Sequence, residues 1–167
     1  MADELIRKTA GDLAVGYEKG GFSPVEVASA VFDRIDAVDG RLNAFRVLDR
    51  DEAMAAATRS TERWLKGAPL SPIDGVPTSI KDLFAVKGMS NRKGSLTTPD
   101  TPDPDDAPTV ARLRNAGAVI LGKTNTPEFG WKGVTDSPAQ GPTRNPWNTD
   151  RTPGGSSGGA SAAAAAE

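Results

Sequence analysis

The chain of 167 residues contains neither histidine nor cysteine. Histidine and cysteine supply the imidazole and thiolate ligands of zinc sites, and histidine is the general base of the Ser-His-Asp triad. A triad of that type, a cysteine nucleophile and a zinc site with these ligands are therefore excluded within these residues. A reactive serine here must give its proton to another kind of base. Lysine is the remaining candidate, because a buried lysine can lose its charge and Ser-Lys pairs replace the triad in some enzymes.

A strong charge of either sign and a long apolar run are also missing. The net charge is -2 and the sequence pI is about 5.3, which gives no reason to expect nucleic-acid binding. We expect a cytoplasmic protein without membrane association, because no stretch has membrane-spanning length and Met1-Ala-Asp-Glu4 does not resemble the start of a signal peptide. Apolar residues make up 37% of the chain and charged residues 25%, as in an ordinary globular domain.

The most informative segment that is present is Arg151-Thr-Pro-Gly-Gly-Ser-Ser-Gly-Gly-Ala-Ser161. Its glycines favour an irregular backbone that other groups can approach closely, and the alanine-rich residues 160–166 predict a helix. Ser156 and Ser157 are therefore expected at or just before a helix N-terminus, where free N–H groups bind developing negative charge. A serine that only caps the helix is the alternative that this segment leaves open.

Lys81 is the best candidate for the base. It lies in Asp74-Gly-Val-Pro-Thr-Ser-Ile-Lys-Asp-Leu-Phe84, which reads as a short buried strand with the lysine at its end. Apolar surroundings would lower the pKa of the amine from about 10.4. Strand alternation would point Asp82 away from Lys81, so that this carboxylate does not hold the amine protonated. Taken alone, Lys81 also fits an exposed or ion-paired lysine.

The segments around Lys81 and around the two serines belong to a series of four segments that together span about residues 70 to 167. They are Gly75-Val-Pro-Thr-Ser-Ile-Lys-Asp82, Gly117-Ala-Val-Ile-Leu-Gly-Lys-Thr-Asn-Thr-Pro-Glu-Phe129, Gly141-Pro-Thr-Arg-Asn-Pro-Trp147 and Gly154-Gly-Ser-Ser-Gly-Gly159. In content and order they resemble the amidase signature family. The helical N-terminal part is compatible with this resemblance.

The resemblance implies an amidase that cleaves a carboxylic amide C–N bond through a Ser-Ser-Lys triad and an acyl-enzyme. By motif, Lys81 matches the triad lysine and Ser156 matches the bridging serine, which the family holds after a cis peptide bond. Gly154, Gly155 and Ser157 are expected to contact substrate. The resemblance implies no metal or organic cofactor, and the expected partner is a small-molecule amide.

The family places its nucleophilic serine in a later Gly-Gly-Ser segment, and this sequence ends at Glu167, before that point. We therefore expect residues 1–167 to be the N-terminal part of one amidase-signature domain, with a helical scaffold in 1–70 and a partial catalytic core in 71–167. This part is expected to be inactive alone, and to be marginally stable or oligomeric, because the sheet edge and helix faces that the missing segment would cover are exposed. A nucleophilic role for Ser157 or Ser161 is the alternative, and nothing in the spacing supports it.

Other functions stay open. The glutamyl/aspartyl-tRNA amidotransferase subunit that hydrolyses glutamine to load a misacylated tRNA shares Thr143-Arg-Asn-Pro-Trp147, and a non-catalytic fragment or interaction module is a further alternative. The segment Gly117-Ala-Val-Ile-Leu-Gly-Lys-Thr124 matches the P-loop pattern, but its interior reads as a buried strand and Asn125-Thr-Pro127 follows where a P-loop would open a helix. Nucleotide binding is therefore disfavoured.

The predicted fold is α/β, with helices covering a mixed sheet that this chain supplies only in part. The turn-rich acidic residues 98–108 are predicted to be a loop. Helices are expected at Leu5–Tyr17, at residues 24–39 after the capping box Ser23-Pro-Val-Glu26, at Asp51–Leu65 and at Asp106–Asn115, and extended segments at Leu42–Leu48, 76–81 and 118–122.

Overall fold

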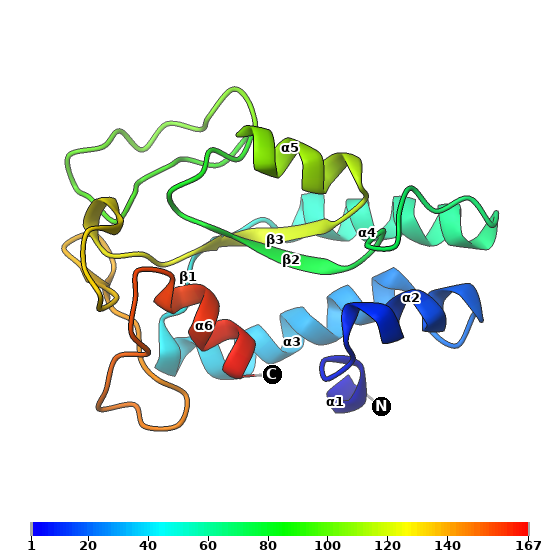
Figure 1. Ribbon diagram of the computed structural model, residues 1–167, viewed down its shortest axis with the longest axis horizontal. Helices are drawn as coiled ribbons and strands as arrows, with labels where there is room; N and C mark the ends of the chain where they lie inside the picture. Colours follow the sequence, from blue (N-terminus) through cyan, green and yellow to red (C-terminus); the bar gives the residue numbers. More distant parts are fainter. Residues whose placement is uncertain (1, 167) are drawn as a thin grey trace. The chain divides into compact units, whose positions relative to one another are not determined.

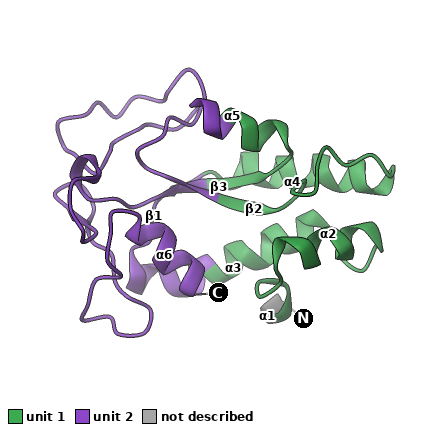
Figure 2. Cartoon of the chain, viewed as in Figure 1, with its two compact units in different colours: residues 1–34, 49–78, 111–121 green, residues 35–48, 79–110, 122–167 purple. Residues whose placement is uncertain are grey.

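The structure is a computed structural model that describes residues 2–166, so Met1 and Glu167 of the predicted domain lie outside it. The chain forms two compact units, each built from separate stretches of sequence (Figure 2). Unit 1 contains Met1–Arg34, Asp49–Thr78 and Ala111–Leu121, and unit 2 contains Ile35–Leu48, Ser79–Val110 and Gly122–Glu167.

Three helices open the chain, and helices and strands then alternate as far as Thr124 (Figure 1). In order they are α1 (Ala2–Leu5), α2 (Ala10–Glu18), α3 (Pro24–Leu42), β1 (Phe45–Leu48), α4 (Arg50–Leu65), β2 (Pro77–Lys81), α5 (Pro108–Asn115), β3 (Val119–Thr124), the 3-10 helix η1 (Glu128–Gly130), β4 (Asp136–Ser137), β5 (Gly141–Pro142) and α6 (Gly158–Ala165).

Capping boxes fix the starts of α2 and α3. The predicted box before α3 is confirmed, since the Glu26 N–H donates to Ser23 Oγ at 3.2 Å and the Ser23 N–H donates back to the Glu26 carboxylate at 2.8 Å. The predicted helix start at Leu5 is wrong. A second capping box, formed by Thr9 and Asp12, begins α2 at Ala10. The Thr9 hydroxyl accepts a hydrogen bond from the Asp12 N–H, which favours a helix N-terminus at this point.

The end of α3 also differs from the prediction, because the helix continues through Gly40 to Leu42. Asn43, and not Gly40, adopts the left-handed conformation that ends a helix, with a φ of 51°. The Asp39 carboxylate accepts the Ala44 N–H at 2.7 Å beyond this turn. The chain is thereby directed from α3 into β1.

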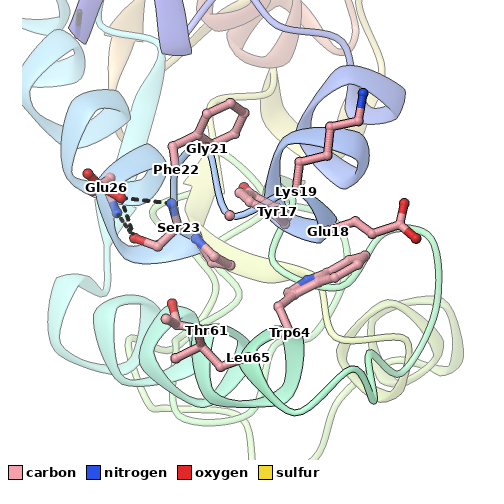
Figure 3. Close-up of a pocket in the computed structure, with 12 residues that line it drawn as sticks. Tyr17, Glu18, Lys19, Gly21, Phe22, Ser23, Glu26, Thr61, Trp64 and Leu65 are labelled. Atoms are coloured by element: carbon pink, nitrogen blue, oxygen red, sulfur yellow. Dashed lines mark hydrogen bonds between the residues drawn. The ribbon is translucent and has the colours of Figure 1, made fainter.

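A buried cluster in unit 1 joins Tyr17 with Leu13 and Val27, and Phe22 and Trp64 pack against it. Tyr17 is buried, lies edge-on to Phe22 at 5.5 Å between ring centroids and donates its hydroxyl to the Gly75 carbonyl at 3.1 Å. Tyr17, Phe22 and Trp64 also line a surface pocket of about 460 Å³ (Figure 3). Unit 1 therefore has a core and a pocket of its own.

The main sheet has three strands in the order β1-β3-β2. Strands β1 and β3 are antiparallel, with Phe45 opposite Thr124 and Leu48 opposite Gly122. Strands β2 and β3 are parallel. The Val119 N–H donates to the Val76 carbonyl where both strands begin, and the Asp82 N–H donates to the Thr124 carbonyl where both strands end. The predicted α/β fold with a mixed sheet is confirmed.

Strand β3 is buried at every residue, including Lys123 and Thr124 of the P-loop pattern. The expectation of a buried strand here is confirmed. Residues 98–108 form a loop up to the start of α5 at Pro108, as predicted. Within residues 2–166, no helix is both long and apolar enough to cross a membrane.

The core of unit 2 joins the chain end to the sheet. Ala162 of α6 is buried in a cluster with Val38, Leu42 and Ala44, and Phe45 of β1 packs against this cluster. Figure 1 shows α6 beside β1 and the last turn of α3. This packing fixes the helix that follows the serine pair.

Candidate active site

Lys81 and Ser156, which are 75 residues apart in sequence, meet in unit 2. The Lys81 Nζ donates to Ser156 Oγ at 2.6 Å, and both side chains are half-buried. Lys81 stands at the end of β2, where burial lowers the pKa of its amine. The structure thus brings together the two residues that the resemblance assigned to the triad.

Asp82, the next residue, is directed elsewhere. Its buried carboxylate lies 2.9 Å from Lys123 Nζ and 3.0 Å from Arg46 Nε, which are ion-pair distances. The expected alternation therefore holds, because Asp82 forms its ion pairs with β1 and β3. Lys81 is left facing the serine.

The residues that carry the serines form a turn over 154–158, which we call the serine turn. Gly154 has a φ of 91°, a conformation that glycine adopts readily, and the peptide bond between Gly155 and Ser156 is cis. The Ser156 carbonyl accepts a bond from Thr126 Oγ1 at 3.1 Å. The backbone of Ser156 is therefore fixed independently of its hydroxyl.

Ser157 differs from its neighbour. It occupies the N-cap position of α6, but its side chain makes no capping hydrogen bond and is exposed. Ser161 lies inside α6. Gly154, Gly155 and Ser157 share the serine turn with Ser156, and their contact with substrate stays a prediction.

Sequence reasoning missed the residues that support this turn. The Thr135 hydroxyl donates to the Gly154 carbonyl at 2.8 Å and accepts the Gly158 N–H at 3.0 Å. Asn125 follows β3, and its carbonyl accepts the Gly159 N–H at 3.2 Å. A signal was available in Lys123-Thr-Asn-Thr126, a polar run that continues an apolar strand. Isolated threonines such as Thr135 give no such signal.

Two aromatic residues, one within η1 and one just after it, are exposed. Phe129 retains 54% of its surface and Trp131 retains 90%. Trp131 therefore does not pack in the core. Within residues 2–166, no group of three or more acidic side chains is arranged to hold a metal ion.

The sequence of the chain matches a known protein family. A model of the Amidase family matches residues 26–167. The chain is 45% identical over 163 residues to a glutamyl-tRNA(Gln) amidotransferase subunit of Thermobifida fusca, covering 98% of this chain and 33% of the relative. It is 44% identical over 158 residues to the indoleacetamide hydrolase of Bradyrhizobium diazoefficiens, covering 95% of this chain and 30% of the relative.

Solved structures give the same result. The peptide amidase of Stenotrophomonas maltophilia matches with a TM-score of 0.87 and 34% identity, over 94% of this chain and 34% of that one. A chain from a vestigial complex connected with the origins of an s-triazine catabolic enzyme matches with a TM-score of 0.90 and 36% identity, over 95% and 35%. The chain spans about a third of the length of the curated relatives it matches. It belongs to the amidase signature family.

Proposed function

We propose that these residues supply the lysine and the bridging serine of a Ser-Ser-Lys centre that hydrolyses a carboxylic amide. The observation that carries the proposal is the 2.6 Å contact between Lys81 Nζ and Ser156 Oγ. A lysine that faces a hydroxyl, with its pKa lowered by burial, is suited to accept a proton. The family resemblance assigns the nucleophilic serine to a segment beyond these 167 residues.

In the proposed reaction, that serine attacks the amide carbonyl and passes its proton to Ser156. Ser156 at the same time gives its own hydroxyl proton to neutral Lys81. The proton then returns along the same path to the leaving nitrogen, the C–N bond breaks, and an acyl-enzyme remains. Attack by water, with the same proton relay, releases the carboxylic acid and restores the serine.

A chimaera tests this proposal. Residues 1–167 would replace the matching segment of the Bradyrhizobium indoleacetamide hydrolase, whose name gives a test substrate. We expect ammonia release from indoleacetamide, and Lys81→Ala should lower kcat by at least about a thousandfold. Lys66→Ala, which removes an exposed lysine after α4, is the control. A folded Lys81→Ala chimaera with full activity would exclude a role for this amine.

The isolated 167 residues should show no amide turnover, because loss of a nucleophile from a concerted triad costs on the order of a millionfold in rate. The purified chain would be incubated with aryl and aliphatic amides. Turnover that Lys81→Ala abolishes would show that a serine within the chain serves as nucleophile. The small-molecule substrate, self-association and cytoplasmic location stay predictions.

The second candidate is the glutamine-hydrolysing subunit of a glutamyl-tRNA amidotransferase, and the 45% identity to the Thermobifida subunit favours it. Such a protein would hydrolyse glutamine through the same Lys81 and Ser156. Glutaminase activity that appears only when partner subunits are added would support this candidate. Activity on other amides without partners would favour the independent amidase.

A further inference from the structure

Thr135 is a buried residue whose hydroxyl is bonded to the serine turn. It is 1% exposed, and its hydroxyl bonds two backbone groups of the turn at once. It donates to the Gly154 carbonyl at 2.8 Å and accepts the Gly158 N–H at 3.0 Å. These two residues stand two positions before and two positions after Ser156. One hydroxyl therefore ties together both ends of the segment that carries the bridging serine.

The backbone of Thr135 is fixed as well. Its carbonyl accepts the Thr143 N–H at 2.9 Å, and its N–H donates to Thr152 Oγ1 at 3.3 Å. The first bond joins the residue before β4 to the residue after β5. Because the backbone of Thr135 is held, its hydroxyl is presented at a fixed place.

The turn fits closely against Thr135. A Cβ added at Gly158 would lie 2.2 Å from Thr135 Oγ1, so no larger residue fits there without displacing the threonine. A Cβ at Gly155 would lie 3.0 Å from the backbone of Val134. The glycines on either side of the serines thus allow the residue pair 134–135 to approach the turn.

We infer that Thr135 is a positioning residue, whose hydroxyl holds the serine turn so that Ser156 lies within reach of Lys81. The inference rests on the proposed function, because it concerns the same Ser-Lys contact. The hydroxyl of Thr135 makes the bonds that hold the turn, and its methyl group makes none of them. Valine at this position keeps the shape but removes both bonds, whereas serine keeps both bonds.

The experiment uses the 167-residue chain and follows the labelling rate of the Lys81 amine against pH by mass spectrometry, with Lys66 as internal reference. In Thr135→Val the turn loosens, water reaches Lys81 and the midpoint of labelling moves to higher pH. Each unit of rise lowers the labelling rate at neutral pH about tenfold. Thr135→Ser should keep the wild-type midpoint.

Thr143→Val is the matched control. Thr143 is also fully buried, and its hydroxyl donates to the Asn43 carbonyl at 2.7 Å without touching the serine turn. This variant should lose stability and leave the Lys81 midpoint unchanged. An equal shift in Thr143→Val, or no shift in Thr135→Val, would overturn the inference.

A second measurement needs no substitution. In the wild-type chain the Gly158 amide should exchange its hydrogen more slowly than an exposed amide, and in Thr135→Val at least about tenfold faster than in wild type. Unprotected exchange in the wild type would overturn the inference even if Thr135→Val fails to fold. Failure of the chimaera to hydrolyse amides while Lys81 labelling still depends on Thr135 would overturn the proposed function alone.

Discussion

The carboxylate of Asp82 lies 2.9 Å from the Lys123 amine, although Lys81 is its neighbour in sequence. Lys123 is fully buried, and burial lowers the pKa of its amine while Asp82 opposes that shift. The ion pair joins the residue after β2 to β3. It therefore fixes the chain at the point where Lys81 leaves the strand.

Asp82→Asn should destabilise the chain by about 3 kcal/mol or more, because it leaves the Lys123 cation buried without its counter-ion. Urea unfolding at pH 7 measures this loss. In the double variant Asp82→Asn with Lys123→Met, the uncompensated charge of Lys123 is gone and that of Arg46 remains, so only part of the loss should be recovered. Additive effects of the two substitutions would show that the pair is not coupled.

A buried ion pair in unit 1 gives a prediction about pH. Arg63 donates two bonds to the Asp74 carboxylate, at 2.7 Å and 2.6 Å, and Asp74 is fully buried. Burial raises the pKa of this carboxyl, but the bonds from Arg63 and the Leu70 N–H outweigh it and hold the pKa below its ordinary value. The folded state therefore releases the proton more readily than the unfolded state does.

It follows that Asp74 contributes its full stabilisation above the pKa of the unfolded state, about pH 4. This stabilisation is lost as the pH falls from there through the lowered pKa of the folded state. Asp74→Asn should cost about 3 kcal/mol at pH 7. The difference between wild type and variant should shrink below pH of about 4, as followed by urea unfolding at several pH values. A difference that stays constant down to pH 3 would contradict this account.

Two glycines should respond to alanine in opposite ways. A Cβ at Gly159 would lie 2.4 Å from the Asn125 N and 2.5 Å from the Ala44 carbonyl oxygen, and backbone atoms cannot easily yield. Gly159→Ala should therefore cost about 2 to 3 kcal/mol. Gly40→Ala, in α3 with nothing within 4 Å, should stabilise by about 0.5 to 1 kcal/mol. Thermal unfolding compares the two, and equal effects would contradict the packing of Gly159.

Much of the framework near Lys81 could be predicted from the sequence, because its signals are local. Apolar runs with glycine and proline at their ends located β2 and β3, and strand alternation separated Asp82 from Lys81. The capping box at Ser23 located the start of α3. The start of α2 was missed because a weak apolar pattern begins at Leu5, whereas the hydrogen bonds between Thr9 and Asp12 decide the boundary.

The contact between Lys81 and Ser156 could not be predicted from spacing. The local sequence made Lys81 the best candidate base and drew attention to Ser156 and Ser157, but only the resemblance to a family paired Lys81 with Ser156. The support by Thr135 was missed for a related reason. A buried threonine is recognised as part of a site only when the fold brings it to its partners, here across the 23 residues that separate Thr135 from Gly158.

The most direct test of the central claim compares two adjacent serines. In the chimaera with the Bradyrhizobium hydrolase, Ser156→Ala should lower kcat by at least about a thousandfold with a smaller effect on KM, because Ser156 acts on proton transfer in the transition state. Ser157→Ala should lower kcat by less than about tenfold, since its exposed hydroxyl does not contact Lys81. A larger loss in Ser157→Ala than in Ser156→Ala would contradict the account and move the bridging role by one residue.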